Sequence, residues 1–209
     1  MDPGAAAGSA HRAGLSANTL NLEPILPNQQ SPMTQTSAPA VDLIDQLTGL
    51  VPGSATYALR HQRDKVVAAT QGSHDALFDP ALPGLSLEER LLVALYAARL
   101  TPSAALAAHY RARLEQLGAD AAHVRAAAEG QPQEIAEPRL RAMLAFTRTL
   151  IEKPVEGDKA ALQALPAAGL STPAVVTLAQ LIAFLSYQVR LVAGLDALKA
   201  LNDTAGAQA

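Results

Sequence analysis

Residues 86–118 have the sequence SLEERLLVALYAARLTPSAALAAHYRARLEQLG. Its start has the pattern of a capping box. The Ser86 hydroxyl can accept a hydrogen bond from the backbone of Glu89, while the Glu89 carboxylate accepts one from the backbone of Ser86. A run of apolar and small residues follows directly. This pattern predicts a strongly apolar helix over residues 87–100.

A second helix is expected immediately after the first. Thr101 is a suitable N-cap, and Pro102 suits the first helical position, where its missing N–H costs no hydrogen bond. The helix should run to about Leu117, because Gly118 readily adopts the left-handed conformation that commonly ends a helix. Residues 86–118 therefore predict two consecutive helices.

The rest of the chain from residue 41 onward also has helical patterns. Apolar residues make up 49% of the 209 residues and aromatic residues only 3%, and no stretch alternates as a strand would. Pro166–Gly169 is expected to separate the last two helices. We predict an all-α fold, a bundle of about six to eight helices. Its further helices are expected at 41–50, 54–71, 120–129, 137–152, 157–165 and 172–201.

Charge and cysteine content exclude several classes of protein. The 16 Lys and Arg residues against 19 Asp and Glu give a net charge of −3, which offers no electrostatic surface for nucleic acid. The chain contains no Cys, so disulfides, Cys-ligated zinc, iron–sulfur clusters and thiol catalysis are excluded. It has no Gly-rich phosphate loop and no metalloprotease His pair. We expect a cytoplasmic protein without a metal or cofactor.

Residues 1–40 differ in composition from the rest of the chain. They contain five Pro residues among Ser, Asn, Gln and Thr, which predicts a disordered or loosely packed arm before a helical domain at 41–209. The apolar run Ala5–Ala7 is too short for a secretory signal.

Residues 174–195 are long enough to cross a bilayer. Polar residues interrupt this stretch, among them Gln180, Gln188 and Arg190, and it has neither an aromatic belt nor a basic flank. A membrane span is the alternative. We predict a buried helix of the bundle and no contact with a membrane.

His109 is the histidine with the most suggestive surroundings. Helical spacing places Pro102, Ala105 and His109 on one face. Small residues beside an imidazole leave a concavity in front of it, although a closely packed neighbouring helix would fill the same space. From this pattern His109 is either a functional residue or a core histidine.

The residues around His109 resemble those of the carboxymuconolactone decarboxylase family, which has the AhpD-like alkylhydroperoxidase fold. The resemblance begins at residues 87–102 and continues to His109 and Gly118. It extends through 141–150 and through LQALPAAGLSTPAVVTLAQLIAFLSYQVRLVAGL at 162–195, which is similar to the C-terminal helices of the peroxidase-related branch. It covers most of the chain from residue 41 to 201.

Peroxidase members of the family carry a C-x-x-C-x-x-x-H motif on the helix of His109. Matching His109 to the motif's His places its two Cys positions at Pro102 and Ala105, so both thiols are missing. The family's acidic relay residue falls at Arg90, and Glu89 is its neighbour, about 100° round the helix. Peroxide reduction by this mechanism needs thiols, so we predict that the chain has no intrinsic disulfide-based peroxidase activity.

The decarboxylases of the family also lack the Cys pair and keep a His. The resemblance implies His109 as general acid or base with Glu89 as its acidic neighbour, Arg90 or Arg190 as the anion partner, and Tyr110 or Tyr187 as a hydrogen-bond donor. The substrate would be a small molecule, in decarboxylase- or lactone-type chemistry.

A second function stays open. The chain is then a catalytically silent protein that binds a ligand or serves as partner to a Cys-containing paralogue. Family members assemble as trimers or larger, and the apolar last helix offers a surface to cover, so we expect a homo-oligomer.

Overall fold

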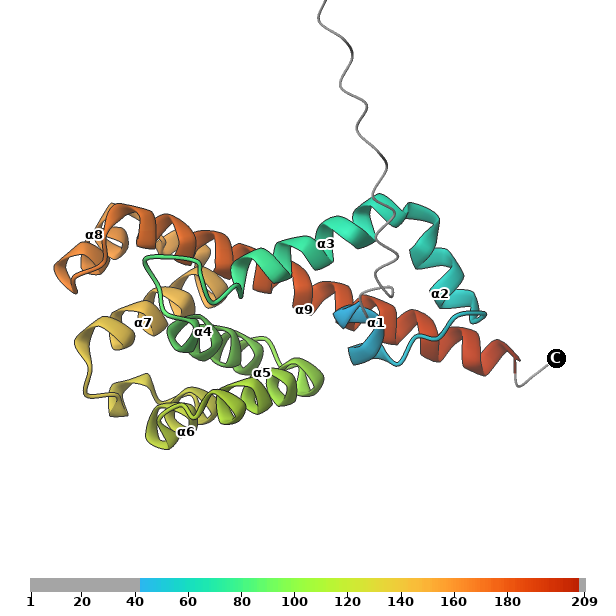
Figure 1. The fold of residues 1–209 in the computed structure, drawn as a ribbon, viewed down its shortest axis with the longest axis horizontal. Helices are drawn as coiled ribbons and strands as arrows, with labels where there is room; N and C mark the ends of the chain where they lie inside the picture. Colours follow the sequence, from blue (N-terminus) through green and yellow to red (C-terminus); the bar gives the residue numbers. More distant parts are fainter. Residues whose placement is uncertain (1–41, 207–209) are drawn as a thin grey trace, which may run out of the picture. The chain divides into compact units, whose positions relative to one another are not determined.

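The computed structural model describes residues 42–206, and no strand occurs among them (Figure 1). The all-α class is confirmed. Seven helices of the described residues, α3 to α9, have nine residues or more, which agrees with the expected bundle of six to eight. The helices are α1 (Leu43–Thr48), α2 (Ala55–Arg60), α3 (Asp64–Leu77), α4 (Leu87–Leu100), α5 (Ala104–Leu117), α6 (Ala121–Glu129), α7 (Pro138–Glu152), α8 (Lys159–Ala167) and α9 (Thr172–Gly206), with short 3₁₀ turns at His61–Arg63, Pro132–Glu134 and Pro154–Glu156.

Helix α4 is the central element of the bundle. Every residue from Arg90 to Ala98 is buried, and α4 packs against α5, α6, α7 and α9. The capping box is present: Ser86 Oγ accepts from the N–H of Glu89 at 3.0 Å, and Glu89 Oε2 accepts from the N–H of Ser86 at 2.7 Å. A helix buried on all sides explains why residues 91–98 have no polar face.

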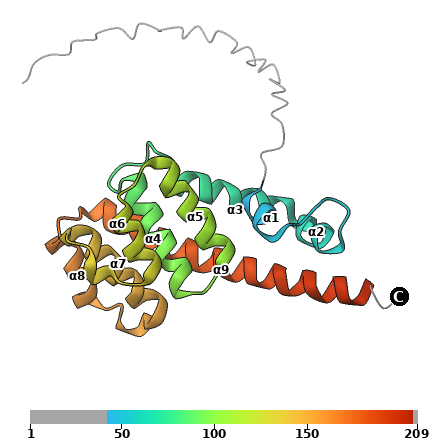
Figure 2. The same ribbon diagram turned by 90° about the horizontal axis from the view of Figure 1, so that it is seen from below.

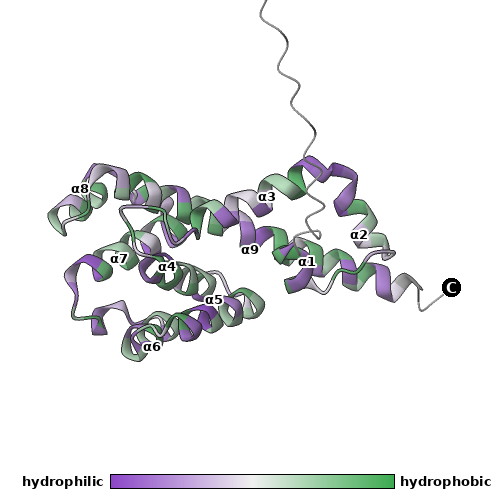
Figure 3. Cartoon of the chain, viewed as in Figure 1, coloured by the Kyte–Doolittle hydropathy of each residue, from purple (hydrophilic) through white to green (hydrophobic). Residues whose placement is uncertain are grey.

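Helix α9 contacts two groups of helices along its length. It packs against α4, α7 and α8, and also against α1, α2 and α3 (Figures 1 and 2). By length and composition alone, Thr172–Thr204 of this helix could span a membrane. In this structure 44% of its most apolar stretch of 18 residues is buried. Figure 3 shows polar residues interrupting the apolar surface of α9.

Three expected helix boundaries are wrong. Thr101 and Pro102 do not start α5, because the N–H of Ser103 bonds to the carbonyl of Ala98 and residues 101–103 serve to end α4. The expected helix over 54–71 is divided by the 3₁₀ turn His61–Arg63. Helix α8 continues through Pro166 instead of stopping before it.

Residues 42–206 belong to one compact helical unit. The remaining expected helices are close to the observed α1, α6, α7 and α9. The predicted arm, residues 1–40, lies outside the described residues.

Candidate functional site

A cleft of about 530 Å³ opens between the end of α3, the segment that follows it, and α5. We call it the His109 cleft. It combines titratable side chains from two helices with a wall of loop residues. Its lining residues are His74, Asp75, Ala76, Phe78, Asp79, Pro80, His109 and Arg113.

His109 projects from α5 and is partly buried. Its Nε2 atom is buried and has no hydrogen-bond partner among residues 42–206. The ring lies edge-on to Tyr110 and 6.1 Å, centroid to centroid, from the ring of His74. Burial, and then the positive charges of protonated His74 and of Arg113, lower the pKa of His109 to about 4. At pH 7 His109 is therefore a neutral imidazole with an unused nitrogen.

Arg113 lies one helical turn after His109, so both side chains project from the same face of α5. Its guanidinium carbon is 5.1 Å from the centre of the Phe78 ring, and Nη1 is 3.5 Å from Nε2 of His74. Within the described part of the chain, no carboxylate lies within 4 Å of this guanidinium. Burial lowers the pKa of Arg113 from the ordinary arginine value. Arg113 thus makes no direct ion pair with a carboxylate of the described residues, although Asp75 and Asp79 line the same cleft.

His74 connects Arg113 to an acidic residue. Nδ1 of His74 is 3.2 Å from Oδ1 of Asp75, which also accepts a hydrogen bond from Gln71 Nε2 at 2.8 Å. A proton on Nδ1 would be donated to Asp75 and would leave Nε2 free to accept from Arg113. Burial lowers the pKa of His74, and the Asp75 carboxylate partly offsets that effect. The neutral form of His74 can therefore orient the Arg113 guanidinium.

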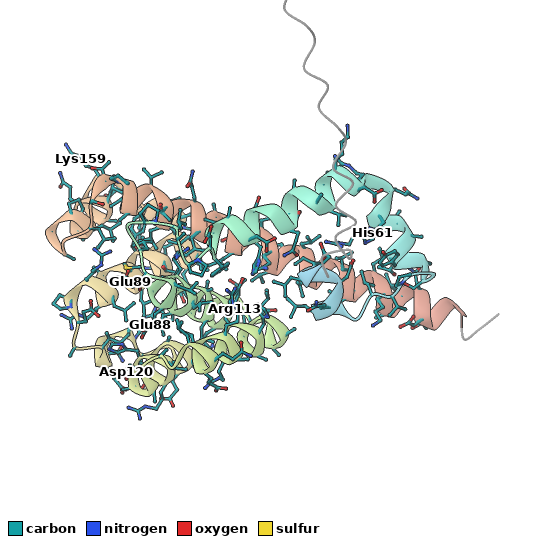
Figure 4. All side chains as sticks on the ribbon, in the orientation of Figure 1. His61, Glu88, Glu89, Arg113, Asp120 and Lys159 are labelled. Carbon is teal, nitrogen blue, oxygen red and sulfur yellow. The ribbon has the colours of Figure 1, made fainter. Side chains whose placement is uncertain are left out.

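The structure does not bring Glu89 to the His109 cleft. Its carboxylate caps α4 and pairs with Arg139, whose Nε donates to Glu89 Oε1 at 2.6 Å. Glu89 lines a separate cleft of about 450 Å³ with Glu88, Asp120 and other residues. None of these three acidic residues, which Figure 4 labels together with Arg113, lines the His109 cleft.

Arg90 is fully buried and does not line the cleft. Its guanidinium donates to the carbonyls of Leu77 at 2.6 Å and Asp79 at 2.9 Å, while Nε donates to the carbonyl of Ser86 at 3.2 Å. In this position Arg90 fastens the segment after α3, which forms one wall of the cleft, to α4.

The remaining expected residues also lie outside the lining of the cleft. The Tyr110 hydroxyl is buried and donates to Oε1 of Gln188 at 2.6 Å, tying α5 to α9. Tyr187 is 43% exposed, and its hydroxyl is 3.1 Å from that of Thr70. Arg190 is exposed and donates to the carbonyl of Ser186 in its own helix. Only His109 of the expected site residues lines the cleft.

The small-residue face expected beside His109 does not form the cleft. Pro102 precedes α5 and is exposed, and neither it nor Ala105 lines the cleft. The cleft instead lies where α3 ends. Sequence reasoning missed Arg113, although its spacing of four residues from His109 was a usable signal. It also missed His74, which only tertiary packing brings near His109.

No group of three or more His, Asp or Glu side chains within residues 42–206 is arranged to hold a metal ion. No protein-family model matches this chain. No curated protein sequence matches it significantly either. The chemistry of the His109 cleft is therefore the basis for a functional proposal.

Proposed function

We propose that this chain is a cysteine-free, AhpD-like protein that catalyses proton transfer on a small molecule carrying a carboxylate, such as a carboxylated lactone. One observation carries the proposal. An imidazole nitrogen with no partner and an arginine with no carboxylate partner, both among the described residues, lie one turn apart on α5 at the same cleft. A base beside an unpaired cation suits a substrate that is both anionic and acidic at carbon.

Each residue of the cleft has a separate part in this proposal. Arg113 binds the carboxylate and keeps the negative charge neutralised while that charge moves onto carbon or a carbonyl oxygen. His109, neutral at pH 7, removes a proton from carbon or returns one. His74, bonded to Asp75, is a positioning residue for Arg113. Arg113 thereby takes the anion-binding part that the resemblance assigned to Arg90 or Arg190.

The cleft favours this function over a silent scaffold. A core histidine would have its nitrogens bonded to neighbouring groups, because a buried polar atom without a partner costs free energy. His109 Nε2 has no such partner among the described residues, and the cleft beside it has the volume of a small-molecule site. Thiol-dependent peroxide reduction is not part of the proposal, since the chain has no Cys.

We also propose that the protein is cytoplasmic and forms a homo-oligomer. Gln188 of α9 is buried and bonded to Tyr110, a contact that a membrane-spanning α9 would have to break. Exposed apolar side chains on α9, such as Val176 and Leu201, support a further protein surface against this helix.

The proposal is tested by proton exchange in D₂O. The protein is incubated with a panel of carboxylated γ-lactones and 3-oxo acids, and NMR follows deuterium entry at carbon and loss of the carboxylate. We expect at least one compound to react about tenfold or more faster than in buffer, within the rate enhancement that general acid–base catalysis supplies. If benzoate binds in the cleft but no compound of the panel reacts faster than in buffer, the protein is a silent ligand-binding one.

A further inference from the structure

A second cavity, of about 620 Å³, lies between α1, α2 and α3. We call it the α3 cavity, after the helix that supplies much of its lining: Asp64, Val67, Ala68, Gln71, Gly72 and Asp75. It shares Asp75 with the His109 cleft, but His109 and Arg113 do not line it. Its volume is typical of a small-molecule site. The α3 cavity is therefore a candidate binding site that is separate from the proposed proton-transfer chemistry.

Asp64 and Asp75 lie at the two ends of the α3 part of this lining. Their spacing in the helix places them about 16 Å apart along its axis and within about 20° of each other around it. Their side chains are 83% and 61% exposed, so a ligand can reach both carboxylates. Two accessible negative charges therefore face the same cavity from opposite ends of one helix face.

At the Asp75 end, α1 adds a second carboxylate. The N–H of Leu43 donates to Oε1 of Gln71 at 2.8 Å, so the preceding residue, Asp42, lies close to this part of α3. Asp42 also lines the cavity, and its Oδ2 atom is buried without a hydrogen-bond partner among the described residues. A buried carboxylate oxygen without a donor is costly, and a positively charged donor nearby would reduce that cost.

At the Asp64 end, Asp45 of α1 is the second carboxylate. Its Oδ2 is 2.9 Å from Nε2 of His61, and Nδ1 of the same ring is 3.6 Å from Oδ1 of Asp64. Arg60 pairs with Asp45 at 2.6 Å and with Asp42 at 3.0 Å, but no Lys or Arg of residues 42–206 lines the cavity itself. The carboxylates therefore outnumber the permanent cations that contact them in this part of the chain, and the lining is negatively charged.

Small and apolar residues separate the two acidic ends. Val67, Ala68 and Gly72 line the cavity on α3, together with Leu50 and Tyr57 from the segments before it. Glycine inside a helix is less stable than alanine, yet a Cβ at Gly72 would meet no atom within 4 Å. Close packing therefore does not require glycine at this position. Its missing side chain leaves room between the carboxylates for an extended hydrocarbon chain.

We propose that the α3 cavity binds a linear aliphatic diamine. One ammonium group lies at Asp64 and Asp45, the other lies at Asp75 and Asp42, and the methylene chain passes over Gly72. An ammonium group donates to more than one carboxylate oxygen, and the apolar lining removes the chain from water. A metal ion suits the cavity less well, because no three His, Asp or Glu side chains of the described residues converge to hold one.

The test measures the binding of 1,8-diaminooctane to the full chain by calorimetry at pH 7. Two comparison compounds separate charge from length: 1,4-diaminobutane has both charges on a short chain, and 8-amino-1-octanol has the same length with one charge. We expect 1,8-diaminooctane to bind about fivefold or more tightly than either, because each comparison compound loses one ion pair. Binding should weaken as the salt concentration rises.

Two variants locate the ligand in the cavity. Asp64→Asn should weaken the binding of 1,8-diaminooctane about three- to fivefold, whereas the matched control Asp196→Asn should bind like the wild type, because Asp196 is exposed on α9 and does not line the cavity. Gly72→Leu should abolish detectable binding, because the leucine side chain occupies the space between the acidic ends. Leucine favours a helix more than glycine does, so this variant should melt at the wild-type temperature or above it.

The outcomes separate this inference from the proposed function, which uses His109 and Arg113 instead. Equal affinity for the three compounds would overturn the arrangement with two acidic ends. No binding of 1,8-diaminooctane, or wild-type binding by Gly72→Leu, would overturn the assignment of a diamine to the α3 cavity. Selective binding of 1,8-diaminooctane without reaction of any carboxylate in the panel would support the inference and contradict the proposed function.

Discussion

The His109→Gln variant should transfer protons about 10²–10⁴-fold more slowly than the wild type, which is the usual contribution of a positioned acid–base side chain. Glutamine keeps a polar group of similar reach but cannot exchange a proton at neutral pH. Since Arg113 is unchanged, the affinity for benzoate should stay close to that of the wild type. The rate is measured by deuterium incorporation and the affinity by calorimetry.

His123→Gln is the matched control for this prediction. His123 is also a helical histidine, and it lines the separate cleft that contains Glu88 and Asp120. His123 does not line the His109 cleft. It should react at the wild-type rate. A His109→Gln protein that keeps the full rate would rule out His109 as the acid or base, whatever its effect on binding.

The Arg90→Met variant should lower the free energy of unfolding by about 2–4 kcal/mol. Methionine retains the buried aliphatic contacts but cannot donate to the carbonyls of Leu77, Asp79 and Ser86. The carbonyls of Asp79 and Ser86 keep a backbone donor, from Leu82 and from residue 90 itself, whereas the carbonyl of Leu77 loses its donor. An unpaired buried carbonyl costs about 1–3 kcal/mol, and each lost hydrogen bond from a charged donor adds to that cost. Urea unfolding followed by circular dichroism at 222 nm measures the change.

Arg99→Met provides the comparison on the same helix. Arg99 is exposed in the last turn of α4, so its replacement should change stability by less than about 0.5 kcal/mol. Arg90→Lys, which keeps one donor group, should be intermediate. Equal stability of the Arg90→Met and Arg99→Met variants would show that the three carbonyl contacts contribute little.

Helix boundaries with explicit chemical signals were predictable. Ser86 and Glu89 specify the start of α4, Asp120 and Gly130 specify both ends of α6, and Gly118 ends α5 in the left-handed conformation. These signals are local, because a cap bonds to backbone groups only two or three residues away. The predicted start of α5 was wrong. Thr101 and Pro102 are residue types that suit a helix N-terminus, but the N–H of Ser103 bonds back to α4, so these residues end α4 instead.

The site was predictable only in part. His109 was found from its sequence context, but its expected partners Glu89, Arg90, Tyr187 and Arg190 bond elsewhere. Arg90 illustrates the reason. The family resemblance offered Arg90 as the anion partner, and only the packed segment after α3 reveals that its donors are occupied by carbonyls.

The sequence alone determined that this chain is helical, that it has no thiol chemistry, and where α4 begins and α6 begins and ends. These properties depend on composition and on contacts between near neighbours in the chain. Tertiary structure alone decided that His74 joins His109 and Arg113 at one cleft and that Arg90 fastens the segment after α3 to α4. The physical reason is that a side chain's chemistry depends on its burial and on which partners have already used its donors and acceptors, and packing between distant segments sets both.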